Sequence, residues 1–112
     1  MDTAVLDRMT GFATETLASE DAARIGGLVR VMALRWPRER ALSISFALTS
    51  AAAEMEDLMA DRSHEGAASR AYKMAALVAA DVLAIEASGI EVARGKDLLH
   101  YWRRADPYFL DL

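Results

Sequence analysis

The chain of 112 residues contains no cysteine, no asparagine and no glutamine. Without cysteine, disulfide bonds, thiolate metal sites and thiol nucleophiles are all excluded. Without asparagine and glutamine, the chain lacks the usual bidentate readers of adenine and the usual amide donors of catalytic sites. Any sequence-specific reading of DNA would therefore rest on arginine, serine and threonine.

Long apolar runs are also missing. The longest apolar stretch, Met74 to Ile85, is interrupted by Asp81 and is well short of the roughly 20 residues that a membrane-spanning helix needs. The first residues carry early acids and lack the basic-then-apolar plan of a secretory signal. We therefore expect a cytoplasmic protein that does not enter a membrane.

What the chain does contain favours helices. Hydrophobic residues make up 54% of it, with many alanines, few aromatic residues and only two prolines. This length and composition predict one folded domain spanning residues 1–112. Arginine greatly outnumbers lysine, which together with the alanine content suggests a GC-rich bacterial genome.

Apolar spacing and capping residues predict an all-α fold. We expect a small bundle of four to five helices, built round a long antiparallel hairpin of the third and fourth helices. Ser19 is the expected cap of the second helix, Pro37 the first residue of the third, and Gly89 the terminator of the fourth. The expected helices are Thr3 to Ala18, Ser19 to about Arg35, Pro37 to about Ala60, Ser63 to Ser88, and Val92 (or Asp97) to Arg104.

The fourth expected helix is apolar nearly all round between Met74 and Ile85, so it needs neighbours on several sides. It is either the central helix of the monomer or partly covered by a second subunit, and the two interpretations are compatible. Alanines form two ridges on it, Ala71/Ala75/Ala79 and Ala76/Ala80/Ala84, with Ala47 and Ala51 as a matching seam on the third helix. The candidate residues for dimer or hairpin packing are Ala71, Ala75, Val78, Ala79 and Val82.

A second feature combines basic and aromatic residues in "RWPRER" and "HYWRR". If the two tryptophans pack near each other, the neighbouring arginines could converge into a surface that binds an anion or a partner. The alternative is that these arginines pair with the surplus acids and stack on tryptophan, contributing little. The candidate binding residues are Arg35, Trp36, Arg38, Trp102, Arg103 and Arg104.

Support for catalysis or metal binding is weak. Asp precedes His by three residues in "DRSH" (Asp61 to His64) and "DLLH" (Asp97 to His100), but the inward glutamates of a carboxylate-bridged metal site are not evident. No glycine-rich elbow or phosphate-binding loop is present. We expect no metal, no cofactor and no enzymatic activity.

By elimination, the sequence predicts an interaction or regulatory module that acts as a homodimer and contacts a protein partner. The net charge of −4 argues against nucleic acid as that partner. The alternative is a regulator that binds nucleic acid or a small anion through the Arg/Trp residues. A third possibility is an apolar ligand pocket among methionines, namely Met9, Met32, Met55, Met59 and Met74.

Overall fold

The computed structural model describes residues 3–58 and 65–112 of the chain. In this part of the chain it contains six α-helices, one 3-10 helix and no β-sheet, which confirms the all-helical bundle. There is one more helix than expected because the second predicted helix is divided in two. The elements are α1 (Thr3–Ala18), α2 (Ala22–Gly26), α3 (Leu28–Arg35), α4 (Ala41–Leu58), α5 (Glu65–Ala87), α6 (Gly95–Arg104) and η2 (Tyr108–Leu110).

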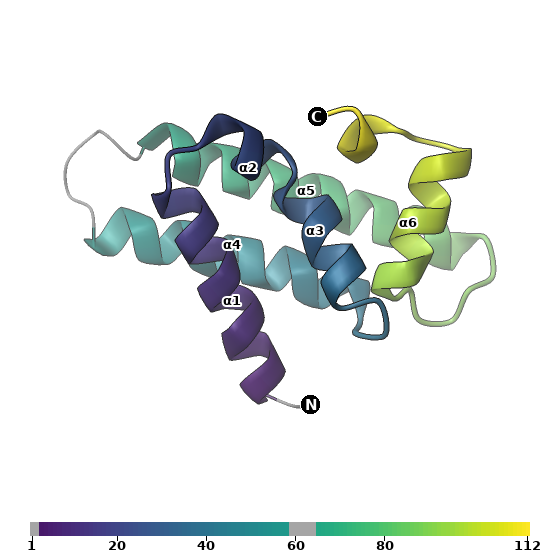
Figure 1. Cartoon of the computed structure of the whole chain (residues 1–112). Coiled ribbons are helices and arrows are strands. Elements are labelled where there is room, and N and C mark those ends of the chain that lie inside the picture. Colours follow the sequence, from purple (N-terminus) through teal and green to yellow (C-terminus); the bar gives the residue numbers. More distant parts are fainter. Residues whose placement is uncertain (1–2, 59–64) are drawn as a thin grey trace.

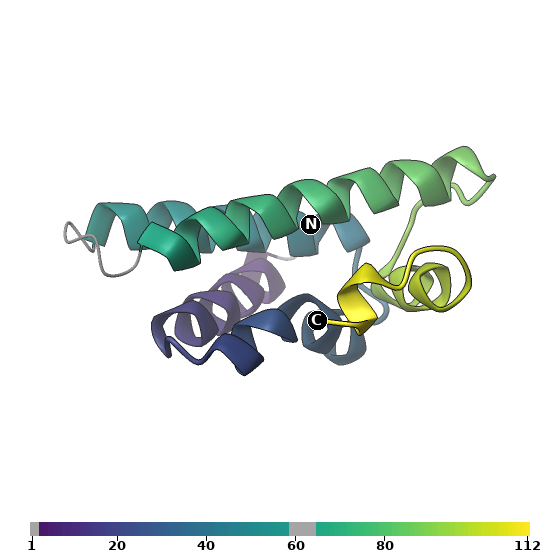
Figure 2. The same cartoon turned by 90° about the horizontal axis from the view of Figure 1, so that it is seen from above.

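The helices lie in two layers (Figures 1 and 2). α4 and α5 are the longest, and they lie side by side with their chain directions opposed. The Ser45 hydroxyl donates a hydrogen bond of 2.8 Å to the Ala75 carbonyl across their contact. α1, α2, α3 and α6 gather on one side of this pair, as Figure 2 shows. None of these four helices covers the opposite side.

The segment between α1 and α3 is capped differently from the expectation. Ser19 is not the helix cap, because its hydroxyl donates a 2.6 Å hydrogen bond back to the Thr16 carbonyl at the end of α1. Asp21 caps α2 instead, accepting from the backbone amides of Ala23 and Arg24 at 3.0 and 3.2 Å. Gly27 lies between the two helices, as the C-cap of α2 and the N-cap of α3.

The third expected helix begins later than predicted, at Ala41 rather than Pro37. Residues 37–39 form a turn, in which the Glu39 amide donates to the Trp36 carbonyl at 3.3 Å, and the segment before α6 holds this turn in place. The Pro37 carbonyl accepts from the Lys96 amide at 2.9 Å, and the Ala41 amide donates to the Ala93 carbonyl at 2.8 Å. These tertiary hydrogen bonds satisfy backbone groups that a helix would otherwise use.

The ends of α5 and α6 follow local rules. Gly89, with a φ of 117°, lies just beyond the end of α5, as expected for glycine in this position. α6 begins at Gly95, neither at Val92 nor at Asp97. Asp97 accepts a 2.8 Å hydrogen bond from the Arg94 amide and so closes the first turn of α6. The expected cap Ser63 lies outside the described residues.

The hydrophobic core lies between the two layers. Most of the methionines belong to it: Met9, Met32, Met55 and Met74 are almost fully buried, whereas Met59 lies outside the described residues. They pack with the other large side chains of the core and provide a continuous apolar interior. The largest of these side chains are Trp102, Phe109, Leu17, Leu28, Ile44, Leu48 and Leu98.

Candidate functional site

The side of the α4–α5 pair that the other helices leave uncovered is apolar. Each helix contributes four residues at positions i, i+4, i+7 and i+11, a spacing that places side chains on one side of a helix. None of the eight is charged. This outer face consists of Leu42, Phe46, Thr49 and Ala53 on α4 and Tyr72, Ala76, Ala79 and Leu83 on α5.

Three large side chains of the outer face are strongly exposed. Leu83 retains 71% of its accessible surface, Leu42 56% and Phe46 55%. Around them lie small side chains, so the outer face has few long groups that would hold a partner at a distance. Its edge is polar, because the Tyr72 hydroxyl is hydrogen-bonded to Glu56. That bond raises the pKa of Tyr72, and desolvation and the charges of Glu56 and Asp57 raise it further.

The residues predicted for dimer or hairpin packing mainly face the core and not the outer face. They occupy the inner side of α5, where it contacts α4 and the rest of the core, and only Ala79 is partly exposed at the edge. The ridge on the other side, Ala76/Ala80/Ala84, is exposed. The buried members are Ala71, Ala75, Val78 and Val82.

Helical spacing predicted that Leu42 lies on the inner side of the third expected helix, but Leu42 is exposed on α4. Ala41, Ile44 and Leu48 fill that side and are buried. Leu42 is one residue from Ala41 and therefore about 100° round the helix. Phe46 and Leu83 were not among the candidate residues predicted from the sequence. Their signal was that each is an apolar residue outside a helical stripe that is already complete without it.

Trp36 belongs to an aromatic cluster with α1. Its ring meets the Phe12 ring edge-on, with centroids 5.9 Å apart. The Arg35 guanidinium lies over both rings, 5.1 Å from the Phe12 centroid and 4.9 Å from the Trp36 centroid. Cation–π contact of this kind leaves the N–H edges of a guanidinium free for an anion.

Trp102 lies elsewhere, in the core. Its ring packs on Phe109 at a centroid distance of 5.1 Å. α6 begins against Trp36, where the Lys96 amide donates to Pro37, and Trp102 follows about 10 Å further along that helix. The two tryptophans therefore mark different places in the fold.

The remaining arginines of the candidate patch are also separated. Arg103 and Arg104 are exposed at the end of α6, and Arg104 lies 3.3 Å from the His100 ring nitrogen. Arg38 is exposed in the loop before α4, where its carbonyl accepts a 2.7 Å hydrogen bond from the Arg94 guanidinium. Arg35 and Arg38 thus lie near the start of α6, and Arg103 and Arg104 near its end.

Asp81 is the buried charged group of α5. It is 8% exposed, and its carboxylate accepts a 2.9 Å hydrogen bond from the Trp102 indole nitrogen. Burial raises the pKa of Asp81; the hydrogen bond opposes this rise, and the negative charge of Asp106 adds to it. The sequence showed that Asp81 was isolated among apolar residues but gave no indication of its partner.

Comparison with known protein families, with curated proteins and with solved structures gives no match. The geometry of the chain itself must therefore support any functional conclusion. Among residues 3–58 and 65–112, no three His, Asp or Glu side chains gather as metal ligands would. Asp61 and His64 fall outside that part of the chain. None of the described helices has the length and apolar character to cross a membrane.

Proposed function

We propose that this chain is a non-catalytic interaction module of the bacterial cytoplasm that acts as a homodimer through the outer face of α4 and α5. The observation that supports this most strongly is the exposure of Leu42, Phe46 and Leu83 on one uncharged surface. Monomeric proteins seldom leave contiguous apolar patches of this kind in water. Such patches are typical of protein–protein contacts.

Burial of these side chains supplies a driving force. Fully burying a leucine or phenylalanine contributes about 1.5–3 kcal/mol. In a twofold interface each of these residues is buried once in each subunit. Association costs an estimated 4–15 kcal/mol in lost freedom. Because these side chains are 55–71% exposed in one chain, three anchors in each subunit offset the lower part of that range, and the apolar surface around them supplies the rest.

A second copy of the chain suits this surface better than a charged partner. The eight residues of the outer face carry no charge, so two copies can meet without like-charge repulsion. Ala76 and Ala79 allow two helix pairs to approach closely, and the assembled interface would resemble a four-helix bundle. Dimerisation through the outer face would also fix the positions of the two subunits, so that their other surfaces could bind a protein partner.

The test compares two leucines of similar chemistry on different sides of the molecule. Leu83→Glu places a charge on the outer face, and Leu34→Glu places the same charge on α3, where Leu34 is 52% exposed. Both positions face solvent in one chain, so both variants should keep their helical circular dichroism. We expect size-exclusion chromatography with light scattering to show a monomer for Leu83→Glu and a dimer for Leu34→Glu. Equal masses for both variants would contradict the proposal.

Anion binding remains the alternative function. The observation in its favour is that Arg35, stacked on Phe12 and Trp36, is only three residues before Arg38, whose carbonyl holds the Arg94 guanidinium. A phosphate-rich ligand would bind there with strong salt dependence. Arg38→Ala would then weaken binding to a short oligonucleotide at low salt, and Arg103→Ala, at the far end of α6, serves as the separate probe of the other arginines. Indifference to both substitutions favours the interaction module.

A further inference from the structure

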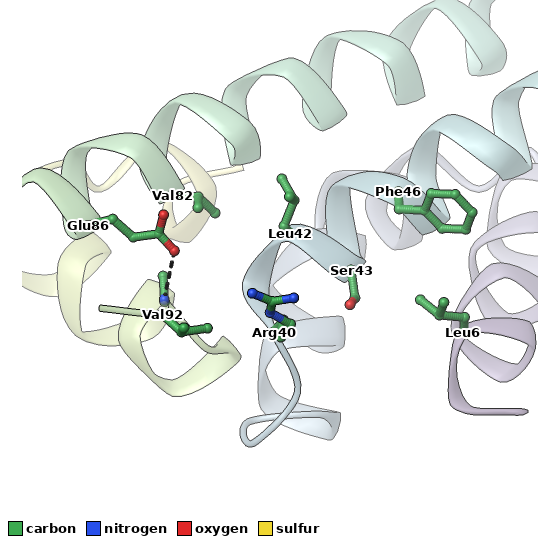
Figure 3. A pocket seen from close by; sticks show the side chains of 9 residues that line it. Leu6, Arg40, Leu42, Ser43, Phe46, Val82, Glu86 and Val92 are labelled. Atoms are coloured by element: carbon green, nitrogen blue, oxygen red, sulfur yellow. Dashed lines mark hydrogen bonds between the residues drawn. The ribbon is translucent and has the colours of Figure 1, made fainter. Parts of the chain in front are cut away.

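A pocket of about 350 Å³ opens where α4 begins (Figure 3). α1, α4, α5 and the segment before α6 all contribute side chains to it. Its volume lies at the lower end of the range typical of small-molecule sites. Its apolar walls are Leu6, Leu42, Phe46, Val82, Val92 and Ala93, and its polar groups are Arg40, Ser43 and Glu86.

The polar groups of this pocket differ in their availability. Glu86 is engaged, because its carboxylate accepts a 3.0 Å hydrogen bond from the Ala93 amide. Arg40 extends its guanidinium between the apolar walls in Figure 3. Within the described part of the chain, nothing forms a hydrogen bond or ion pair with that guanidinium or with the Ser43 hydroxyl. One cation and one hydroxyl are therefore available to a ligand.

The backbone holds Arg40 firmly in this place. Arg40 and Arg94 face each other in an isolated antiparallel bridge. The hydrogen bonds on either side of them join Ala41 to Ala93 at 2.8 Å and Gly95 to Glu39 at 3.0 Å. This is the pattern in which the two facing Cα atoms lie closest, at roughly 4.5 Å.

Two like charges that face each other across a bridge are unfavourable without a counter-ion. The Arg94 guanidinium has one compensation, the Arg38 carbonyl at 2.7 Å. Arg40 has no comparable acceptor in the described residues. Of the two arginines, only Arg40 lines the pocket, so Arg40 is the cation that can contact a ligand there.

We propose that this pocket binds a small apolar monocarboxylate, a ligand that the self-association described above does not require. The Arg40 guanidinium would pair with the carboxylate, the contact for which its planar fork is best suited. The Ser43 hydroxyl would donate a further hydrogen bond. The hydrocarbon part would lie against Leu42, Phe46 and Val82.

Glu86 restricts the ligand class further. Its charge lies across the pocket from Arg40 in Figure 3, so a second negative group on the ligand would meet repulsion. A monoanion with an apolar body can pair with Arg40 and places no second negative group near Glu86. A dicarboxylate or a phosphate ester does not.

The probe is octanoate, titrated into the purified full chain by isothermal calorimetry, with backbone NMR to locate its contacts. The controls share its eight-carbon tail: 1-octanol has no charge, and octylammonium has the opposite charge. We expect octanoate to bind most tightly and to shift the resonances of Ser43 and Val92. The variant is Arg40→Gln, with Arg103→Gln as a matched control on α6. Loss of a charge-assisted contact predicts a fall in affinity on the order of tenfold for Arg40→Gln and no change for Arg103→Gln.

Three results would overturn this proposal: no octanoate binding, octylammonium binding as tightly as octanoate, or equal affinity in the two arginine variants. The titration should be repeated in Leu83→Glu, because Leu42 and Phe46 belong to both the pocket and the outer face whereas Leu83 lines only the outer face. If octanoate still binds to Leu83→Glu, ligand binding in the pocket does not depend on the oligomeric state. Failure of either proposal can then be recognised without reference to the other.

Discussion

The indole nitrogen of Trp102 donates a hydrogen bond of 2.9 Å to the carboxylate of Asp81, and both side chains lie in the interior. This contact joins the C-terminal part of α5 to the C-terminal part of α6. It gives the buried carboxylate a donor, and it provides the buried indole with an acceptor. α6 and the tail that follows it are thereby fixed to the long helix pair.

Removing the indole donor should destabilise the fold. Trp102→Phe keeps an aromatic ring against Phe109 but leaves the Asp81 carboxylate buried without its donor, which costs about 1–3 kcal/mol, with a further loss from the smaller ring. In the Asp81→Leu background the same substitution should cost less, because no buried carboxylate remains. Urea unfolding of the four proteins measures the coupling. Equal costs in both backgrounds would show that the hydrogen bond contributes nothing.

Asp81 should also make stability depend on pH. Its pKa is raised in the folded state, so the folded chain holds this proton more tightly than the unfolded chain. Above the ordinary value of 3.8, the Asp81 contribution to the free energy of unfolding therefore falls as pH rises, until the raised folded value is passed. The Asp81→Asn variant lacks this term. Urea unfolding over a pH series should show the wild-type chain losing stability relative to Asp81→Asn in that window, and parallel curves would contradict it.

Gly95 is required by close packing at the start of α6. A Cβ added there would lie 2.5 Å from the Trp36 carbonyl oxygen and 3.1 Å from Pro37 Cα. Both are backbone atoms, so relief requires the chain to move, and Gly95→Ala should cost about 1–3 kcal/mol. Gly11→Ala is the matched control, because nothing lies within 4 Å of a Cβ at that helical position.

The control should change stability in the opposite direction. Alanine in the exposed interior of α1 is favoured over Gly11 by about 0.4–1 kcal/mol. Thermal unfolding followed by circular dichroism gives both values. If Gly95→Ala were neutral or stabilising, that result would contradict the close contact between the start of α6 and the backbone that follows α3.

The C-terminal segment should stabilise the monomer. Phe109 is 2% exposed and packs on Trp102, so Phe109→Ala should cost about 3–5 kcal/mol. That is a large part of the 5–15 kcal/mol available to a typical domain. Tyr108→Ala, at a position 39% exposed, should cost much less. Deletion of residues 108–112 should likewise lower the melting temperature, and an unchanged value would contradict this role.

Local patterns predicted the helices well and their junctions poorly. The bounds of α1 are as expected, because its apolar spacing is unambiguous. Pro37 is a favourable first helical residue, yet α4 begins at Ala41. The decisive hydrogen bonds come from residues 93–96, more than fifty positions away, and no local pattern contains them.

The sequence predicted apolar packing around the fourth expected helix, but it did not predict which side of that helix is exposed. The apolar stretch around Asp81 indicated that α5 needs apolar neighbours, but which side of α5 stays exposed in one chain depends on how α1, α3 and α6 pack. The pairing of Trp102 with Asp81 depends on the same packing. The sequence suggested that Trp36 and Trp102 could pack near each other. In the structure Trp36 packs against Phe12 and Trp102 against Phe109.

Dimerisation through the outer face can be tested in the unmodified chain. Methyl groups of Leu42 and Leu83 on the outer face, and of Leu34 on α3 as the internal control, can be followed by NMR with a soluble paramagnetic probe at low and high protein concentration. All three are more than half exposed in one chain. If the chain dimerises through the outer face, Leu42 and Leu83 become protected from the probe as concentration rises while Leu34 stays accessible. Unchanged accessibility of all three methyl groups, or protection of Leu34 alone, would contradict it.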